Sequence, residues 1–163
     1  MKSQSELELL KVIAVDRIEE SGVKHLAVAV SGSVESIIVL IAAIQVLGKE
    51  NVLAITADAG YTDSKLISLV EKTCDSEGVE HQTIPVMLYE EQIIDLTDSI
   101  TETEYYKTEI LNEMLHEIWI LGFDKLACGC TEDTVHINGN RVFLENDSVI
   151  CPFLSENSVE TAE

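Results

Sequence analysis

The chain has 163 residues, of which 46% are hydrophobic, and only two prolines. This length fits one domain with a sizeable core, and this composition argues against extensive disorder. Acidic residues outnumber basic ones by 30 to 10, which gives a formal charge of −20 and no basic stripe for binding a nucleic-acid backbone. No apolar run approaches the roughly 18 residues that span a membrane. We therefore expect a cytoplasmic protein that contacts neither nucleic acid nor membrane directly.

The first half of the chain alternates between helical and strand-like patterns. Apolar residues recur at helical spacing over residues 5–21. The run "HLAVAV", residues 25–30, lacks polar alternation, which is typical of a strand buried on both faces. Residues 34–48 have the length of a helix that ends at Gly48. A strand over 51–56 and a helix over 62–78 repeat the pattern.

The second half continues this alternation and then changes character. The patterns predict a strand over 80–86, a helix over 105–122 and a fourth strand over 123–129. The acid-rich segment 89–104 between them reads as a short helix and a solvent-exposed loop or lid. Turn signals at Asn-Gly and Asn-Asp predict a small hairpin or meander within residues 136–154.

Strands and helices that alternate along the chain at this spacing predict parallel strands joined by right-handed crossovers. The expected fold is therefore an α/β three-layer sandwich with a mainly parallel, doubly wound sheet. We expect residues 1–154 to form this single domain and the polar residues 155–163 to form a frayed tail.

Three small residues, Ser31-Gly32-Ser33, separate the first predicted strand from its helix. In an open parallel sheet, ligands bind beyond the carboxyl ends of the strands. Gly32 allows close backbone approach, and the serine hydroxyls lie beside amides at a helix start, where the dipole favours an anion. The sequence therefore predicts an oxyanion cradle, and the alternative is an ordinary serine-capped helix. The glycine patterns of dinucleotide folds and of Walker-type phosphate loops are both absent.

The segment "SGSVES", residues 31–36, resembles the Ser-Gly-Gly-x-Asp-Ser signature of the PP-loop ATP pyrophosphatases, which have the adenine nucleotide alpha-hydrolase-like fold. "NVLAITADAG" resembles the second strand of this superfamily, and residues 105–133 and 149–154 are similar to later segments of its sulfur insertases and tRNA-modifying enzymes. The resemblance covers roughly residues 20–154. It implies attack on the alpha-phosphate of ATP, release of pyrophosphate, and transfer of sulfur or nitrogen to an adenylated small substrate.

The resemblance also implies roles for particular residues. The cofactors would be ATP and Mg²⁺, the latter because hard cations take oxygen ligands and bridge phosphates. The positions matching the family pattern are Ser31, Gly32, Ser33 and Ser36 for the pyrophosphate part of ATP, Ala57 and Asp58 for adenosine, Gly129 and Thr131 for the nucleotide cleft, and Glu132 and Asp133 for Mg²⁺.

Several positions depart from the family pattern. Ser33 replaces a glycine, which costs about 1 kcal/mol if the backbone there needs a positive φ. Glu35 replaces an aspartate and is either a catalytic acid or a helix-start residue favoured by the dipole. Cys151 stands where the tRNA-modifying branch often has arginine. Lys107 is then the nearest candidate for phosphate neutralisation and a candidate catalytic residue, or else a solvated residue in the first turn of its helix. Arg141 is a second candidate for phosphate neutralisation.

These departures leave other functions open. One alternative is a non-catalytic nucleotide-sensing or scaffold subunit of a hetero-complex, and another is a sulfur or metal carrier based on Cys128, Cys130 and Cys151. Against the carrier stands the interpretation that these cysteines are buried small hydrophobes. Enzymes that the chain resembles commonly carry a further substrate or dimerisation domain, so we expect a homo-oligomer or a partner subunit. Trp119 is expected to pack in the core.

Overall fold

The computed structural model describes residues 3–58, 64–85, 108–131, 136–137, 140–141 and 148–154. Within them the helices are α1 (Gln4–Ser21), α2 (Val34–Leu47), α3 (Ser64–Glu77) and α6 (Thr108–Ile120), with a short 3-10 turn at Lys49–Asn51. The strands are β1 (Leu26–Ala29), β2 (Val52–Asp58), β3 (Glu80–Pro85), β4 (Leu126–Cys128), β5 (His136–Ile137), β6 (Asn140–Arg141) and β7 (Val149–Ile150). The predicted helices and strands over these residues are confirmed, with boundaries that differ by a few residues. The acid-rich segment 89–104 lies outside the described residues.

Five strands form one parallel sheet in the order β3-β2-β1-β4-β7. The predicted α/β fold with a mainly parallel sheet is therefore confirmed. β1 lies between β2 and β4, and its residue Ala29 aligns with Ile55 on one side and Cys128 on the other. The chain winds outward from β1 through β2 to β3 and then returns to place β4 on the opposite side. The strand order thus reverses between β1 and β4.

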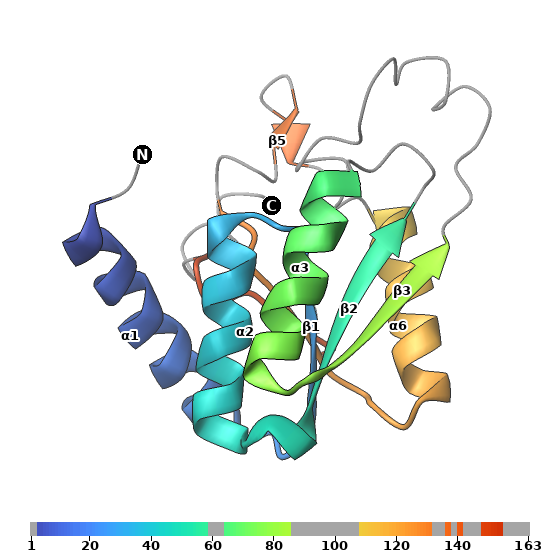
Figure 1. The fold of residues 1–163 in the computed structure, drawn as a ribbon, viewed down its shortest axis with the longest axis horizontal. Helices are drawn as coiled ribbons and strands as arrows, with labels where there is room; N and C mark the ends of the chain where they lie inside the picture. The colour runs from blue at the N-terminus through green and yellow to red at the C-terminus, as the bar shows by residue number, and fades with distance from the viewer. Residues whose placement is uncertain are drawn as a thin grey trace.

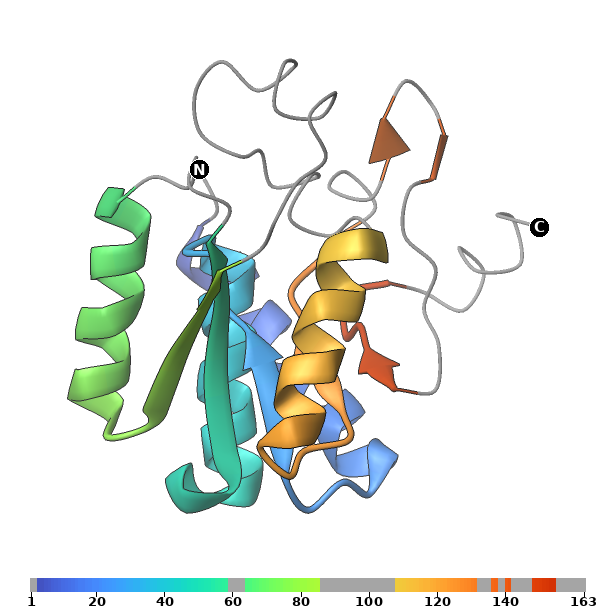
Figure 2. The same cartoon turned by 90° about the vertical axis from the view of Figure 1, so that its right-hand side faces the viewer.

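Two hydrophobic cores lie on opposite faces of this sheet. Figures 1 and 2 show the helices that cover these two faces. One core packs α1, α2 and α3 against the sheet, and we call it the α2-side core. The other packs α6 against the sheet, and we call it the α6-side core. α2 is apolar on nearly all sides because the sheet covers one flank and Ala14 and Ile18 of α1 pack in the same core. The described part thus has the three layers that the sequence predicts.

The C-terminal segment agrees with the predicted hairpin or meander in part. β5 and β6 do form a small antiparallel pair. β7, however, pairs in parallel with β4 and becomes the fifth strand of the main sheet. Its two residues, Val149 and Ile150, were too short a run to distinguish from a loop.

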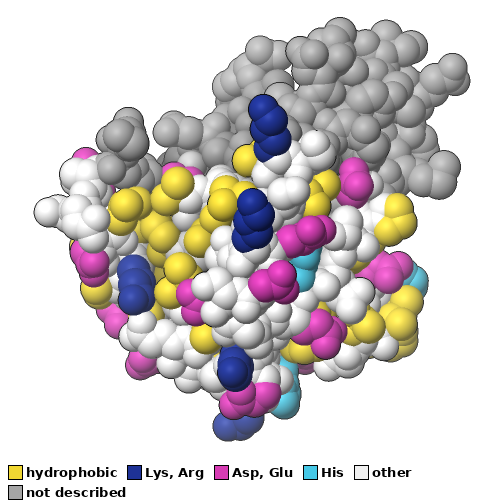
Figure 3. Space-filling model, viewed as in Figure 1, with side chains coloured by type: hydrophobic (Ala, Val, Ile, Leu, Met, Phe, Trp, Pro, Cys, Tyr) yellow, Lys and Arg dark blue, Asp and Glu magenta, His cyan; other side chains and the backbone are white. Residues whose placement is uncertain are grey.

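On the face of the molecule seen in Figure 3, the basic groups of the described residues are separated. Figure 3, in the view of Figure 1, shows Lys and Arg side chains apart from one another and interspersed with acidic ones. The prediction that Trp119 packs in the core is wrong, because its side chain is 70% exposed. Leu111, Met114 and Ile118 bury one side of α6, and Trp119 follows Ile118 by about 100° of helical rotation, which turns it outward. None of the helices in the described part of the chain is both long and apolar enough to cross a membrane.

Candidate functional site

Three loops that contain predicted site residues leave the same edge of the sheet. Because β1, β2 and β4 are parallel and adjacent, their carboxyl ends meet. The segment Ser31–Ser33 follows β1, Asp58 ends β2, and Gly129 to Thr131 follow β4. The reversal of strand order between β1 and β4 makes this edge the topological switch point, where open α/β sheets bind ligands.

The backbone of the loop after β1 shows which position needs glycine. Gly32 has a φ of +100°, a conformation that side-chain-bearing residues rarely adopt. Ser33 has a φ of −69° and a ψ of 155°, ordinary extended values. The backbone cost considered for serine at position 33 therefore does not arise, because the positive φ falls on Gly32. Ser33 is instead the N-cap of α2, and its hydroxyl accepts a hydrogen bond from the Ser36 amide at 3.2 Å.

The serine hydroxyls of this loop bond to one another and to the backbone. Ser36 Oγ accepts from the Ser31 amide at 3.3 Å and donates to the Ser33 carbonyl at 2.9 Å. Ser31 Oγ lies 3.2 Å from Ser33 Oγ. Ser31 and Ser36 are buried, whereas Ser33 is partly exposed. These bonds hold the loop in a defined shape around the first turn of α2, where the amide dipoles favour an anion.

Gly129 joins the loop after β4 to the start of α2. A Cβ atom built on Gly129 would lie 2.6 Å from the Ser36 nitrogen and 2.8 Å from the Glu35 carbonyl carbon. Real Cβ atoms essentially never approach backbone so closely, so any side chain here would displace one of the two segments. Gly129 thus brings the two loops of the switch point into direct backbone contact.

Two residues that the sequence analysis did not assign to the site support the loop from the neighbouring strands. Thr56 Oγ1 donates to the Val30 carbonyl at 2.8 Å, immediately before Ser31. The Thr56 hydroxyl lies 2.9 Å from His81 Nε2, so it accepts from that nitrogen when it donates to Val30. Burial lowers the pKa of His81, and the carboxylates of Glu71 and Asp75 partly oppose this effect. A neutral His81 therefore completes a hydrogen-bonded link from β3 through β2 to the end of β1.

Solved structures with a similar fold are known, although no protein-family model matches the chain and no curated protein matches it by sequence. The NH3-dependent NAD synthetase from Campylobacter jejuni, in complex with a nitrate ion, superposes with a TM-score of 0.60 at 15% identity over 96% of this chain and 69% of that one. The glutamine-dependent NAD+ synthetase from Acinetobacter baumannii, in complex with ADP, gives 0.63 at 15% identity over 99% of this chain and 32% of that one. The NMN synthetase from Francisella tularensis gives 0.59 at 14% identity over 99% and 70%.

The chain has the adenine nucleotide alpha-hydrolase-like fold. The resemblance to the PP-loop superfamily, drawn from residues 31–36, is confirmed at the level of this fold. NAD synthetases belong to that superfamily, and the chain spans 32–70% of the three neighbours.

The alpha-hydrolase-like fold brings most of the described site residues to one edge. Glu35 lies in the first turn of α2 and is partly exposed. Asp58 and Thr131 are also partly exposed. Ala57 is 3% exposed and belongs to the α6-side core. Leu66 of α3, which the sequence analysis did not consider, lies against Gly32, with its Cβ 3.0 Å from a Cβ built there.

The remaining predicted site residues lie outside the described residues or have no described side chain. Lys107, Glu132 and Asp133 fall outside the described ranges, and Arg141 is described by its backbone in β6 alone. Their assignments from the alpha-hydrolase-like resemblance stay predictions.

The four cysteines of this chain are all reduced and buried. Cys128, Cys130 and Cys151 belong to the α6-side core, which agrees with the interpretation as small hydrophobes. Within the described ranges, no three His, Cys, Asp or Glu side chains converge to hold a metal ion.

Proposed function

We propose that this chain binds ATP at the switch point between β1 and β4, with the pyrophosphate part of the nucleotide in the loop after β1. The observation that carries the proposal is the shape of this loop. Gly32 has a φ of +100°, and Ser33 after it caps a fourteen-residue helix whose first-turn amides face the same edge of the sheet. A helix N-terminus that follows such a glycine turn favours phosphate through its amide groups and its dipole.

The structural neighbours support this class of ligand. Two of them are named for the synthesis of NAD and one for that of NMN, and one was solved with ADP bound. At such low sequence identity, the similarity supports a shared fold and does not extend the neighbours' substrates or products to this chain. The shared fold and the loop after β1 together favour a nucleotide over a smaller anion.

In the proposed arrangement, ATP lies along the carboxyl edge of the sheet, and different residues contact its phosphates and its adenosine. Ser31, Ser33 and Ser36 offer hydroxyls, and the α2 amides offer N–H groups, to the phosphate oxygens. Asp58, at the end of β2, borders the adenosine. Ala57 contributes there through its backbone, because its side chain is buried in the α6-side core.

Glu35 bears on whether a divalent cation accompanies the nucleotide. Its carboxylate lies in the first turn of α2 beside the proposed phosphate position, so a bare triphosphate would meet like charge there. Mg²⁺ prefers carboxylate and phosphate oxygens and commonly takes only one or two protein ligands. The donor set at this edge fits Mg²⁺, with Glu35 or Asp58 from the described residues and Glu132 or Asp133 as further proposed ligands. Bound there, Mg²⁺ would neutralise phosphate charge.

The reaction we propose is adenylation of a small substrate with release of pyrophosphate, ahead of nitrogen or sulfur transfer. The amides and hydroxyls of the loop would hold the leaving pyrophosphate, and Lys107 would neutralise its charge. A second copy of the chain or a partner subunit would contribute to substrate recognition.

A pyrophosphate-release assay tests this reaction. Purified protein is incubated with ATP, MgCl₂ and mononucleotides that carry a carboxylate or carbonyl group, with ammonium or sulfide as the nucleophile. We expect release that depends on one such acceptor and falls at least about tenfold in Glu35→Gln, in line with loss of a charged active-site group. ATP binding without release for any acceptor would identify the non-catalytic nucleotide-sensing subunit instead.

A further inference from the structure

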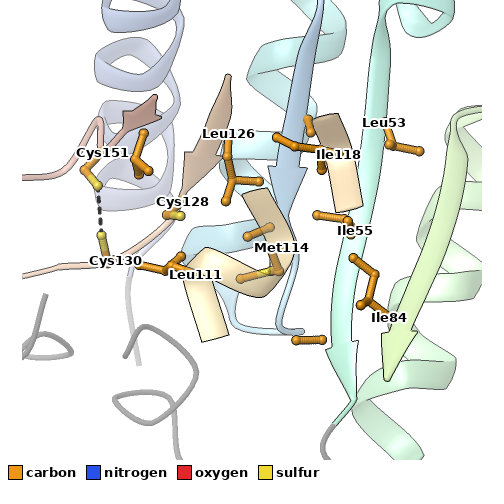
Figure 4. Close-up of a cluster of buried hydrophobic side chains, with 14 of the residues drawn as sticks. Leu53, Ile55, Ile84, Leu111, Met114, Ile118, Leu126, Cys128, Cys130 and Cys151 are labelled. Atoms are coloured by element: carbon orange, nitrogen blue, oxygen red, sulfur yellow. Dashed lines mark hydrogen bonds between the residues drawn. The ribbon is translucent and has the colours of Figure 1, made fainter. Parts of the chain in front are cut away.

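Two cysteine thiols from separate segments meet in the α6-side core. Cys130 follows β4, and Cys151 follows β7. Cys130 Sγ donates a hydrogen bond to Cys151 Sγ at 3.2 Å, and both side chains are 0% exposed (Figure 4). Because β4 and β7 pair in parallel, the segments that follow them leave the sheet at the same edge, side by side.

The other two cysteines are placed differently. Cys74 lies in α3 within the α2-side core, on the opposite face of the sheet. Burial, with a further contribution from Asp75, raises the pKa of Cys74 to about 11, and the sheet separates it from Cys130 and Cys151. Cys128 shares the α6-side core. Cys130 and Cys151 come from separate segments, and their sulfurs lie 3.2 Å apart.

We propose that Cys130 and Cys151 form a redox modification site, in which a reversible disulfide regulates the loop after β1. The consequence for nucleotide affinity rests on the proposed function, whereas the modification itself does not. The oxidant is a peroxide, which is small enough to reach a buried thiol. One thiol is oxidised to a sulfenic acid with release of water, and the second thiol displaces a further water to form the disulfide. A thiol reductant restores both cysteines by exchange.

The disulfide affects the loop after β1 through Gly129, the residue next to Cys130. Cys130 directly follows Gly129, whose Cα leaves no room for a Cβ against the Glu35 and Ser36 backbone. A disulfide needs an S–S distance of about 2.05 Å, so the two sulfurs must approach from 3.2 Å. β7 lies on the far side of β4 from β1. Closing the bond therefore draws Cys130 and Gly129 away from the start of α2 and weakens the cradle.

The first experiment asks whether the bond forms. The folded chain is treated with hydrogen peroxide without denaturant and analysed by intact mass and by non-reducing peptide mapping. We expect loss of the mass of two hydrogen atoms, a Cys130–Cys151 cross-linked peptide, and recovery of the original mass with dithiothreitol. Cys74→Ala should give the same cross-link, whereas Cys151→Ala and Cys130→Ala should not. A product dominated by sulfinic acid or by another cysteine pair overturns the proposal.

The second experiment asks whether the bond reaches the loop. Hydrogen exchange is compared between the reduced and oxidised wild-type chain, with no nucleotide present. We expect faster exchange at the amides of residues 32–36 in the oxidised form, and unchanged exchange there overturns the regulatory proposal. We also expect oxidation to weaken binding of ATP with MgCl₂ by about fivefold or more, the lower end of typical coupling between sites. A reduced chain that binds no ATP refutes the proposed function, while the cross-link and the exchange rates still decide this inference.

Discussion

Gly129 and Ser36 touch through their backbones: a Cβ on Gly129 would lie 2.6 Å from the Ser36 nitrogen. This contact joins the loops that follow β1 and β4, on the two sides of the point where the strand order reverses. The position of the first-turn amides of α2 therefore depends on a residue nearly a hundred positions away in the sequence. Substitution of Gly129 tests this contact.

Gly129→Ala should disturb both the fold and the site. The added methyl group meets backbone atoms, which cannot rotate away, so we expect the free energy of unfolding to fall by about 1–3 kcal/mol, as for overpacked cores. ATP affinity should also fall, because the start of α2 is displaced. Urea unfolding and calorimetry measure the two effects.

Gly22→Ala is the control for this substitution. Gly22 has a φ of +72° and nothing within 4 Å of a built Cβ. It should lose about 1 kcal/mol of stability through backbone strain alone and keep its ATP affinity. Equal loss of ATP affinity in both variants would refute the role given to the Gly129 contact.

Ser33→Ala tests the N-cap of α2. Ser33 accepts a hydrogen bond from the Ser36 amide, so we expect the free energy of unfolding to fall by about 1 kcal/mol. Ser33→Gly, which restores the family pattern, should cost only a few tenths of a kcal/mol, because glycine is a tolerated N-cap. The matched control is Ser3→Ala, since Ser3 caps α1 through the Glu6 amide at 3.2 Å, away from the site. A similar stability loss in Ser3→Ala with unchanged ATP affinity, against weakened affinity in Ser33→Ala, is the expected pattern.

His81 should make stability depend on pH in a defined direction. Burial lowers its pKa in the folded chain below the ordinary value of 6.5, so the unfolded chain binds the proton more readily. Its contribution to stability is therefore fully present above pH 6.5 and is lost as the pH falls through the folded-state pKa. We expect His81→Gln to reduce the loss of unfolding free energy between neutral and mildly acidic pH, measured against wild type in urea. An unchanged or steeper pH dependence in the variant would count against the buried, neutral His81.

Added salt should strengthen nucleotide binding. A chain with a formal charge of −20 repels a negatively charged nucleotide at long range. The Debye length shrinks from about 30 Å at 0.01 M to about 10 Å at 0.1 M ionic strength, which screens this repulsion. We expect the association rate of ATP with MgCl₂, measured by stopped-flow fluorescence, to rise over this range at constant free Mg²⁺. A rate that falls steeply with salt would contradict this expectation, because it would indicate a positive surface around the site.

Local patterns predicted the elements whose signal is continuous along the chain. The buried strand β1 is an unbroken apolar run, β2 is apolar apart from Thr56 and Asp58, and α2 is long and apolar. The position of Ser31 to Ser33 after β1 placed the loop at the carboxyl edge of a parallel sheet, where the structure has it. These inferences need only hydrophobic periodicity and the rules for parallel sheets.

Features that depend on contacts between residues far apart along the chain were not predicted from the sequence. The Thr56–His81 bond joins two strands, and nothing local to either residue marks it. β7 is recognised as a strand only through its pairing with β4. The family pattern suggested that position 33 needs a positive φ. In the structure the preceding residue, Gly32, has the positive φ, and Ser33 is extended. Trp119 was wrongly predicted to pack in the core because it lies in a continuous run of apolar residues. Only one narrow side of α6 faces the core, and Trp119 is not on that side.

The most direct test of the nucleotide site is calorimetric titration of ATP with MgCl₂ into the reduced wild-type chain and into Gly32→Ala. Gly32 has a φ of +100°, and a Cβ there would lie 3.0 Å from Leu66 Cβ, so the substitution deforms the loop that is proposed to hold the phosphates. We predict measurable binding by wild type and a loss of at least about tenfold, or 1.4 kcal/mol, in Gly32→Ala that remains folded by circular dichroism. No heat with folded wild type, or equal affinity in the two proteins, would contradict the proposal.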